Sequence, residues 1–449
     1  MNRTFGRLLV ALAALFSVLG LGHGSASAQA DVTIQAQVRE QERENGRTNN
    51  QPVAGVTIRV FDPDGNLVAE GITEENGNAV IPVPARSDYV VALDEETLPD
   101  DIAIAANSSA EQEITEASFR TNRRIVSFFT GEFQQVSRSI FDRGAQRFAD
   151  GVQLGLILAM CAVGLSLIFG TTGLTNFAHG EIVTWGGLWA YFFNVTGVTW
   201  LGFLAFLPWV DSSGRFHVLL AAPMAVGVGA LLGWLLDWGL FARLRRRGVG
   251  LISQMVITVG LSILLKNAMQ AYFGGSVRFM RQYLLQDSIM IGPVQVTPRE
   301  IFITVIAFVV LVIVAWTLLY TRLGKATRAV ADNSDLASAT GINSQSVIRL
   351  VWIMGGGLAA LGGTLLALEL GVSYDMGGRL LFLMFAAITL GGLGSALGAL
   401  VGGFFVGVSV EMASLVVPTE LKNTPALLIL ILVLLFRPEG ILGKSQRVG

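Results

Sequence analysis

Three polar side chains, Asn176, His179 and Glu181, lie close together within a strongly apolar part of the sequence. Leaving a polar group unsatisfied in hydrocarbon costs about 2–7 kcal/mol, so these groups must pair with one another or line a wet cavity. Gly173 and Gly180 beside them would let a helix break and expose backbone groups that can hold a zwitterion or an amide. We interpret the cluster as a hydrogen-bonded lock between two helices, as a direct substrate contact or as part of a gate.

Four other ionisable side chains fall within or beside apolar runs. An ionisable group at membrane depth is a candidate functional residue by default, because burying it is costly. Some of the four could instead lie at helix ends that reach water, and Lys266 could neutralise a carboxylate elsewhere in the chain. The four candidates are Asp237, Lys266, Glu369 and Glu411.

The motifs of enzymatic and metal chemistry are absent from the sequence. It has no Gly-x-x-x-x-Gly-Lys-[Ser/Thr] phosphate loop, so ATP hydrolysis would require another polypeptide. Its three histidines form no His-Glu-x-x-His motif, which argues against an intramembrane enzyme. The one cysteine, Cys161, allows neither a disulfide within the chain nor a thiolate metal site. We therefore expect a chain that is not an enzyme and that binds no metal.

The elements that must position these side chains are membrane helices. Hydrophobic residues make up 52% of the chain and charged residues only 14%, about half the charged share of a soluble domain. We predict a mainly α fold, a polytopic transmembrane helix bundle that follows a small all-β sandwich domain. Apolar stretches predict about nine crossings, near 152–170, 178–196, 217–241, 250–273, 301–320, 348–370, 379–394, 396–415 and 424–436.

The charges divide the chain into two parts. Residues 30–116 carry 18 acidic and 5 basic side chains, whereas residues 117–449 carry 15 acidic and 24 basic ones. Such asymmetry predicts two bodies in different environments. The basic residues lie at membrane edges and not on one continuous face, so we expect no nucleic-acid partner.

Residues 1–28 have the features of a signal peptide. Arg3 and Arg7 precede the apolar run 8–21, and the triplet Ala-Ser-Ala at 26–28 is a small-x-small cleavage site. We expect cleavage after residue 28, and an uncleaved anchor is the alternative. Both place the residues that follow outside the cytoplasm.

Residues 29–116 follow a period-two pattern broken by Asp-Gly and Asn-Gly turns, which is typical of antiparallel hairpins. We predict a small exported β-sandwich, and its rhythm resembles carboxypeptidase-regulatory-like, Ig-like and transthyretin-like modules, a resemblance of fold alone. Asp62, Asp64 and Asn66 have oxygens at alternate positions, as in a calcium loop, but a hairpin turn explains them equally well. We expect this domain to meet a neighbouring subunit or a substrate-binding protein.

Residues 117–149 link the exported domain to the membrane. Val126, Phe129 and Phe133 recur at helical spacing, with arginines at polar positions. We predict a juxtamembrane amphipathic linker helix at the outer membrane boundary. Residues 150–449 then form the transmembrane domain. Its basic segments all fall on the cytoplasmic side if nine crossings follow an outer N-terminus, which puts the C-terminus in the cytoplasm of a bacterial cell.

Three stretches carry a family resemblance. The first is GLTNFAHGE at 173–181, the second is 321–352, and the third combines GGLGSALGALVGG at 391–403 with FRPEGILG at 436–443. In this order they resemble the permease subunits of branched-chain amino acid importers of the ATP-binding-cassette class, which also includes urea and amide permeases. The resemblance covers about 300 residues, 150–449, and the exported domain departs from the usual compact member.

The resemblance implies a function and a set of partners. The chain would form the translocation pathway for branched-chain amino acids, or for urea or short amides, by alternating access. A second homologous permease, two ATPase subunits and an external substrate-binding protein would complete the importer. ATP and Mg would bind to the ATPase subunits, and no cofactor would bind to this chain. The alternative is an ion-coupled secondary transporter or channel for small polar solutes, which typically has a clear internal repeat that this sequence lacks.

The resemblance also implies a docking element. In this family the loop that corresponds to 321–346 docks into a groove on the ATPase subunit. Small residues there would permit close contact, and charges would set the register; a merely solvated cytoplasmic helix is the alternative. The residues carried over are Gly324, Arg328, Ala331, Asp332, Ala337 and Gly341.

Overall fold

The structure, a computed structural model, describes residues 32–44, 47–99, 104, 109–115, 123–130, 139–197, 209–210, 214–280, 288–418, 421–437 and 439–442. The predicted signal peptide lies outside these described residues. The chain divides into two compact units, one of Ser25–Ser137 and one formed chiefly by Arg138–Gly449.

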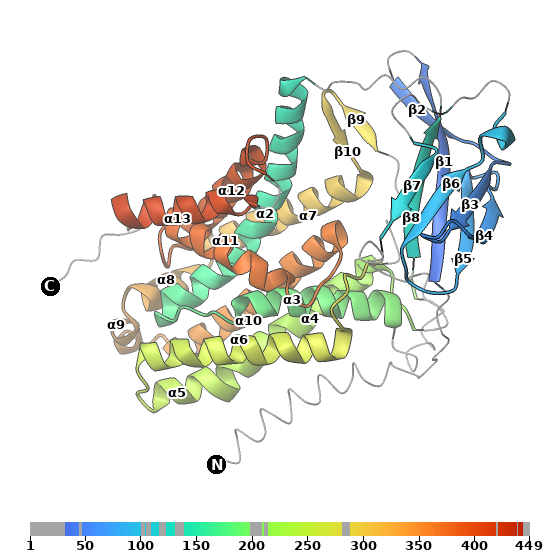
Figure 1. Ribbon diagram of the computed structural model, residues 1–449. Coiled ribbons are helices and arrows are strands. Elements are labelled where there is room, and N and C mark those ends of the chain that lie inside the picture. The colour runs from blue at the N-terminus through green and yellow to red at the C-terminus, as the bar shows by residue number, and fades with distance from the viewer. Residues whose placement is uncertain are drawn as a thin grey trace. The chain divides into compact units, whose positions relative to one another are not determined.

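The smaller unit is a β-sandwich (Figure 1). Its strands are β1 (Val32–Glu44), β2 (Arg47–Pro52), β3 (Thr57–Phe61), β4 (Leu67–Ile72), β5 (Asn78–Val83), β6 (Tyr89–Leu93), β7 (Glu111–Ile114) and β8 (Arg123–Thr130). One sheet has the order β2-β1-β5, with β8 also paired to β1, and the other has the order β4-β3-β6-β7. Ile34 and Ile81 from the first sheet share one core with Ile58 and Val91 from the second. The predicted all-β domain is therefore confirmed.

The linker helix predicted for residues 117–149 is wrong at residues 123–130. Arg123–Thr130 is strand β8, which pairs in parallel with β1. Val126 and Phe128 are buried in the sandwich core, whereas Ile125 is 47% exposed, so the burial alternates. A short apolar run can match both the helical period of 3.6 residues and the strand period of two. Here the pairing with β1 decides in favour of the strand. The helix that follows begins only at Ile140.

The turn between β3 and β4 is built on Asp62. Its Oδ1 accepts a hydrogen bond from Asn66 N (2.8 Å) and its Oδ2 accepts one from the Asn66 side-chain amide (3.0 Å). These hydrogen bonds hold the pKa of Asp62 below its ordinary value. Gly65 has a φ of +84°, which favours glycine. Both carboxylate oxygens serve the hairpin turn, and no group of three or more metal-ligating side chains occurs among the described residues.

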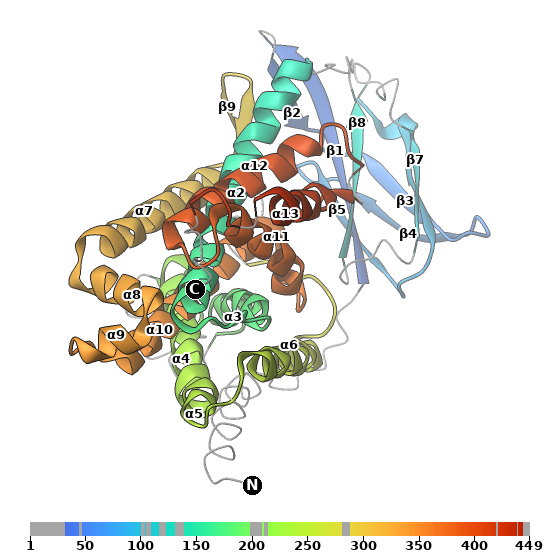
Figure 2. The ribbon, with the colours of Figure 1, turned by 90° about the vertical axis from the view of Figure 1, so that its left-hand side faces the viewer.

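The larger unit is a helix bundle (Figures 1 and 2). Its main helices are α2 (Ile140–Thr172), α3 (His179–Tyr191), α4 (Val218–Leu236), α5 (Ala242–Arg246), α6 (Leu251–Phe273), α7 (Pro298–Tyr320), α8 (Arg322–Asp332), α9 (Ser334–Ala339), α10 (Ser344–Leu370), α11 (Met376–Gly391), α12 (Ala396–Ala413) and α13 (Thr424–Phe436). Two π-helical segments, η3 (Phe192–Thr196) and η5 (Asp237–Phe241), extend α3 and α4. A short hairpin of β9 (Ile289–Ile291) and β10 (Val294–Val296) precedes α7.

The bundle has the membrane-spanning character predicted from composition. Within the described ranges, six helices are long and apolar enough to cross a membrane: α2, α4 with its extension to Arg246, α6, α7, α10 and α12. Helices α11 and α13 are apolar but shorter. The expected crossing at 178–196 is the 13-residue helix α3 continued by η3. The polytopic bundle is confirmed, and the count of nine crossings stays a prediction.

Helices α2 and α10 form the centre of the bundle. The bundle buries 83% of the most apolar window of α2 and 78% of that of α10, against 22% for α6 and 28% for α7. A Cβ on Gly164 would lie 2.9 Å from the Gly355 carbonyl oxygen, so these two helices meet backbone to backbone. Small residues permit such approach in membrane helices. The outer helices present exposed apolar side chains, such as Ile252 of α6 and Phe308 of α7.

Candidate functional site

The polar cluster predicted at 176–181 lies at an interruption between α2 and α3. Helix α2 ends at Gly173, whose φ of +69° lies in the left-handed region. Asn176 is fully buried, and its Oδ1 accepts a hydrogen bond from Ala178 N (3.1 Å). Phe177 N donates to Thr258 Oγ1 of α6 (3.1 Å). The interruption is thus shaped by its own side chains and held by α6.

His179 is the first residue of α3 and is fully buried. Its Nε2 lies 3.1 Å from the carbonyl oxygen of Cys161 in α2. A carbonyl oxygen only accepts, so Nε2 carries the proton and donates. Nδ1 is then an acceptor without a hydrogen-bond partner in the described part of the chain. His179 therefore ties the start of α3 to the middle of α2.

Glu181 is also buried and contacts a third helix. Its Oε1 accepts a hydrogen bond from Ser262 Oγ of α6 (3.0 Å), while Oε2 has no hydrogen-bond partner among the residues described. Lys266 follows Ser262 by one turn of α6, and its Nζ lies 5.7 Å from the ring centroid of Tyr374. A cavity of about 370 Å³ adjoins Lys266 and is also lined by Asp375. The side chains of Asn176, His179 and Glu181 therefore bond to three different partners, while a backbone hydrogen bond joins His179 N to the Asn176 carbonyl oxygen (3.2 Å).

Glu369 and Glu411 lie near the ends of α10 and α12. Glu369 Oε2 accepts a hydrogen bond from Gln153 Nε2 of α2 (3.0 Å), and Arg299 Nε lies 3.8 Å from the same oxygen. Glu411 Oε1 lies 2.5 Å from Lys422 Nζ. Each carboxylate is therefore compensated by a cation, as ionisable groups near a membrane require.

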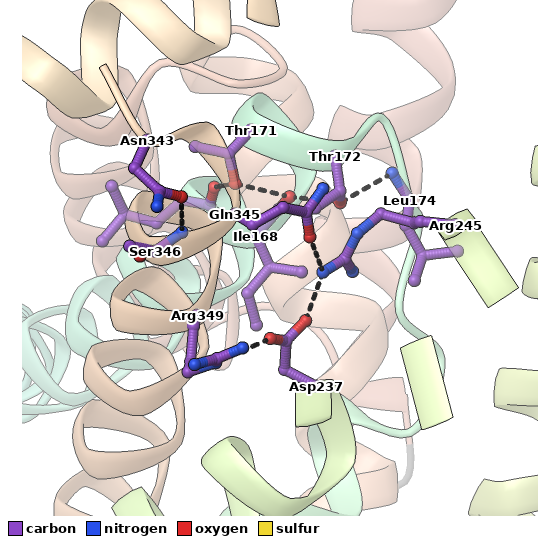
Figure 3. A network of polar contacts seen from close by, with 11 residues as sticks. Ile168, Thr171, Thr172, Leu174, Asp237, Arg245, Asn343, Gln345, Ser346 and Arg349 are labelled. Carbon is purple, nitrogen blue, oxygen red and sulfur yellow. Dashed lines mark hydrogen bonds and ion pairs between the residues drawn. The ribbon is translucent and has the colours of Figure 1, made fainter. Parts of the chain in front are cut away.

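Asp237 belongs to an ion cluster at the other end of α10, shown in Figure 3. It is fully buried at the start of η5, and π-helical turns often occur at functional sites. Its Oδ1 lies 2.5 Å from an Arg245 guanidinium nitrogen, and its Oδ2 lies 3.8 Å from Arg349 Nε of α10. Arg245 also donates to Gln345 Oε1 (3.3 Å). Two cations thereby share one carboxylate between α4, α5 and α10.

The first turn of α10 is bonded to α9 as well. Ser344 Oγ donates to the Ser334 carbonyl oxygen (3.0 Å) and lies 2.7 Å from Ser338 Oγ. Gln345, the next residue, is the one that accepts from Arg245. Helix α9 and the Asp237 cluster are therefore joined through consecutive residues of α10.

The six predicted docking residues lie on α8, on α9 and in the turn that follows α9. Gly324 and Ala337 are buried; a Cβ on Gly324 would clash with the backbone of Leu318. Gly341 has a φ of +91° and ends this segment. The exposed members of the set are Arg328, Ala331, Asp332 and Gly341.

Several residues of these sites were not predictable from the sequence. Leu336 of α9 is 64% exposed beside the exposed docking residues. The same loop also contains Leu323, Val330 and Ile342, so the sequence alone did not distinguish Leu336. Arg245, Arg349 and Ser262 were missed because a pairing between distant residues leaves no local pattern.

Known proteins resemble the helical unit. The family described as the permease component of the branched-chain amino acid transport system matches residues 148–435. The permease protein LivH of Salmonella typhimurium is 31% identical over 311 residues, which are 67% of this chain and 96% of LivH. BraD of Pseudomonas aeruginosa is 31% identical over 307 residues, with the same two coverages. A probable LivH of Methanocaldococcus jannaschii is 27% identical over 305 residues, 65% of this chain and 90% of that protein.

A buried polar interruption inside apolar helices is typical of membrane transporters, and the relatives are named as transport permeases. The chain is therefore a multi-pass transport permease and not an enzyme. It belongs to the family of branched-chain amino acid transport permeases, as the match over 148–435 shows. The resemblance stated from the sequence is thereby confirmed.

Proposed function

We propose that the chain is the permease subunit of an ATP-driven importer that moves branched-chain amino acids across the membrane by alternating access. The observation that supports this most is the interruption between α2 and α3, because it brings buried polar groups into the packed centre of the bundle. Asn176 Nδ2, His179 Nδ1 and Glu181 Oε2 have no hydrogen-bond partner among the described residues. Such groups suit a pathway that fills with water or substrate in one of its states.

ATP would bind, with Mg, to two partner ATPase subunits. Helices α8 and α9 would dock one of these subunits, through the exposed side chains of Arg328, Ala331, Asp332 and Leu336. The buried residues Gly324 and Ala337 would hold the element against the bundle. A second homologous permease and an external substrate-binding protein would complete the importer.

Movement of the docked loop would reach the bundle through α10. The bonds from Ser344 to α9, and from Gln345 through Arg245 to Asp237, form a continuous polar path. A displacement of α9 would therefore act on α4 and α10 together, as rigid-body switching requires. We further propose that the smaller unit lies outside the cytoplasm and the C-terminus inside it.

The substrate assignment can be tested by uptake. A strain that lacks its own branched-chain importers would express the full chain with its partner subunits, and labelled leucine and labelled urea would be compared. We expect saturable leucine uptake that excess valine or isoleucine inhibits. Uptake of urea without uptake of leucine would replace the proposed substrate with an amide.

A further inference from the structure

A cavity of about 410 Å³ lies where α2 begins and α10 ends. Its volume falls within the range of about 300–1,000 Å³ that small-molecule sites occupy. Leu154, Ile157, Leu366 and Leu380 contribute an apolar lining from three helices. Charged side chains of both signs complete it, so the cavity can receive a ligand that is apolar at one end and charged at the other.

Two of its charged residues, Arg147 and Glu411, face each other without a hydrogen bond. An Arg147 guanidinium nitrogen lies 3.6 Å from Glu411 Oε2 and 3.6 Å from Asp150 Oδ2. Glu411 Oε2 is buried and accepts no hydrogen bond from the described residues. A guanidinium has five N–H donors. The pair therefore has unused donors beside an unused acceptor.

Unused donors beside an unused acceptor are complementary to a zwitterion. An α-carboxylate can accept from the Arg147 guanidinium while the adjacent α-ammonium donates to Glu411 Oε2, and charge-assisted hydrogen bonds of this kind are the strong ones. Lys422 can stay on the other oxygen of Glu411, at 2.5 Å. The side chain of the ligand then lies against the leucine-rich lining.

We propose that this cavity binds one zwitterionic α-amino acid with a branched apolar side chain, and that Arg147 and Glu411 hold its charged groups. The inference rests on the proposed function and assigns its substrate to named residues. It adds a ligand site that is separate from the interruption between α2 and α3.

The test uses the full chain in lipid nanodiscs, without ATP or partner subunits. Val277 lines the cavity, so Val277→Cys provides a reporter whose labelling by a maleimide is slowed by a bound ligand. The native Cys161 is fully buried and should stay unlabelled. Protection is titrated with L-leucine, with 4-methylpentanoate, which lacks the ammonium, and with leucinol, which lacks the carboxylate.

We expect leucine to protect better than either analogue. Glu411→Gln should weaken the affinity for leucine about tenfold, or by about 1.4 kcal/mol. It should leave the affinity for 4-methylpentanoate unchanged. Arg147→Gln should weaken the affinity for leucine by a similar factor and leave the affinity for leucinol unchanged. This second variant tests the site if Glu411→Gln fails to fold. Glu300→Gln is the matched control: Glu300 lines the same cavity, but its carboxylate accepts from Thr297 N (2.8 Å) in a capping box that glutamine preserves.

The inference is overturned if leucine gives no protection. It is also overturned if Glu411→Gln weakens the affinities for leucine and 4-methylpentanoate equally and Arg147→Gln weakens those for leucine and leucinol equally. The two proposals fail separately. Leucine protection combined with uptake that needs no ATP would contradict the proposed function and leave this site. ATP-driven leucine uptake combined with an unprotected reporter would contradict this site and leave the proposed function.

Discussion

His179 Nε2 lies 3.1 Å from the carbonyl oxygen of Cys161, so the first residue of α3 is bonded to the middle of α2 across a helix interruption. The bond is fully buried and fixes the start of α3 against α2.

His179→Ala should destabilise the protein by about 1–3 kcal/mol, because it removes a buried hydrogen bond and leaves a space. The midpoint of thermal unfolding of the purified chain should fall accordingly. His179→Gln retains a side-chain donor and should recover part of the loss. Equal midpoints for the alanine variant and the wild type would show that this hydrogen bond does not stabilise the fold.

Gly180→Ala should block uptake and lower stability. A Cβ on Gly180 would lie 2.5 Å from the Gly377 carbonyl oxygen, so α3 and α11 would have to separate. Overpacking of this kind costs about 1–3 kcal/mol. Gly260→Ala in α6 is the matched control, since its Cβ would meet nothing within 4 Å. Uptake and thermal unfolding of both variants would be measured, and equal behaviour would contradict the close approach.

Asp237→Asn should uncouple the importer. The change leaves Arg245, whose side chain is 14% exposed, without its anion, and breaking a buried ion pair costs on the order of 3–5 kcal/mol. We expect uptake to fall at least about tenfold while ATP hydrolysis by the assembled complex continues. Asp64→Asn, at an exposed carboxylate of the β-sandwich, is the control.

A double variant separates charge from packing at this cluster. Adding Arg245→Gln to Asp237→Asn removes the uncompensated cation, so part of the lost stability should return. Strictly additive losses in the double variant would show that Asp237 and Arg245 do not stabilise each other.

Asp332→Arg combined with Gly341→Trp should abolish uptake while membrane insertion persists, because both changes alter the exposed surface of the docking element. Leu336→Asp should likewise weaken ATPase co-purification by at least about tenfold. Ile72→Asp is the control, since Ile72 is 65% exposed in the β-sandwich and Leu336 is 64% exposed in α9. Normal ATPase binding by the loop variants would rule out docking at α8 and α9.

The sequence predicts the polar interruption well but not its contacts. Polar groups in an apolar run are conspicuous, so Asn176, His179 and Glu181 could be found. Their partners could not, because the Cys161 carbonyl oxygen lies 18 residues away from His179 and Ser262 lies 81 residues away from Glu181. Such pairings depend on how helices pack, and a single sequence does not encode packing as a local pattern.

Strand β8 shows a second limit. Val126 and Phe129 are three residues apart, which favours a helix, while Val126 and Phe128 are two apart, which favours a strand. Only the parallel pairing with β1, from Thr33 opposite Arg123 onward, decides between the two. Long apolar helices such as α7 and α10 were predictable, because a run of about 20 apolar residues fits a membrane-spanning helix and is too long for a strand.

ATP-dependent uptake in proteoliposomes tests the central claim most directly. The full chain would be reconstituted with its partner permease and ATPase subunits, with the binding protein outside and ATP inside, and accumulation of labelled leucine would be followed. We predict accumulation that requires hydrolysable ATP and persists when proton and sodium gradients are collapsed. Accumulation by the chain alone, driven by an ion gradient without an ATPase, would contradict the account.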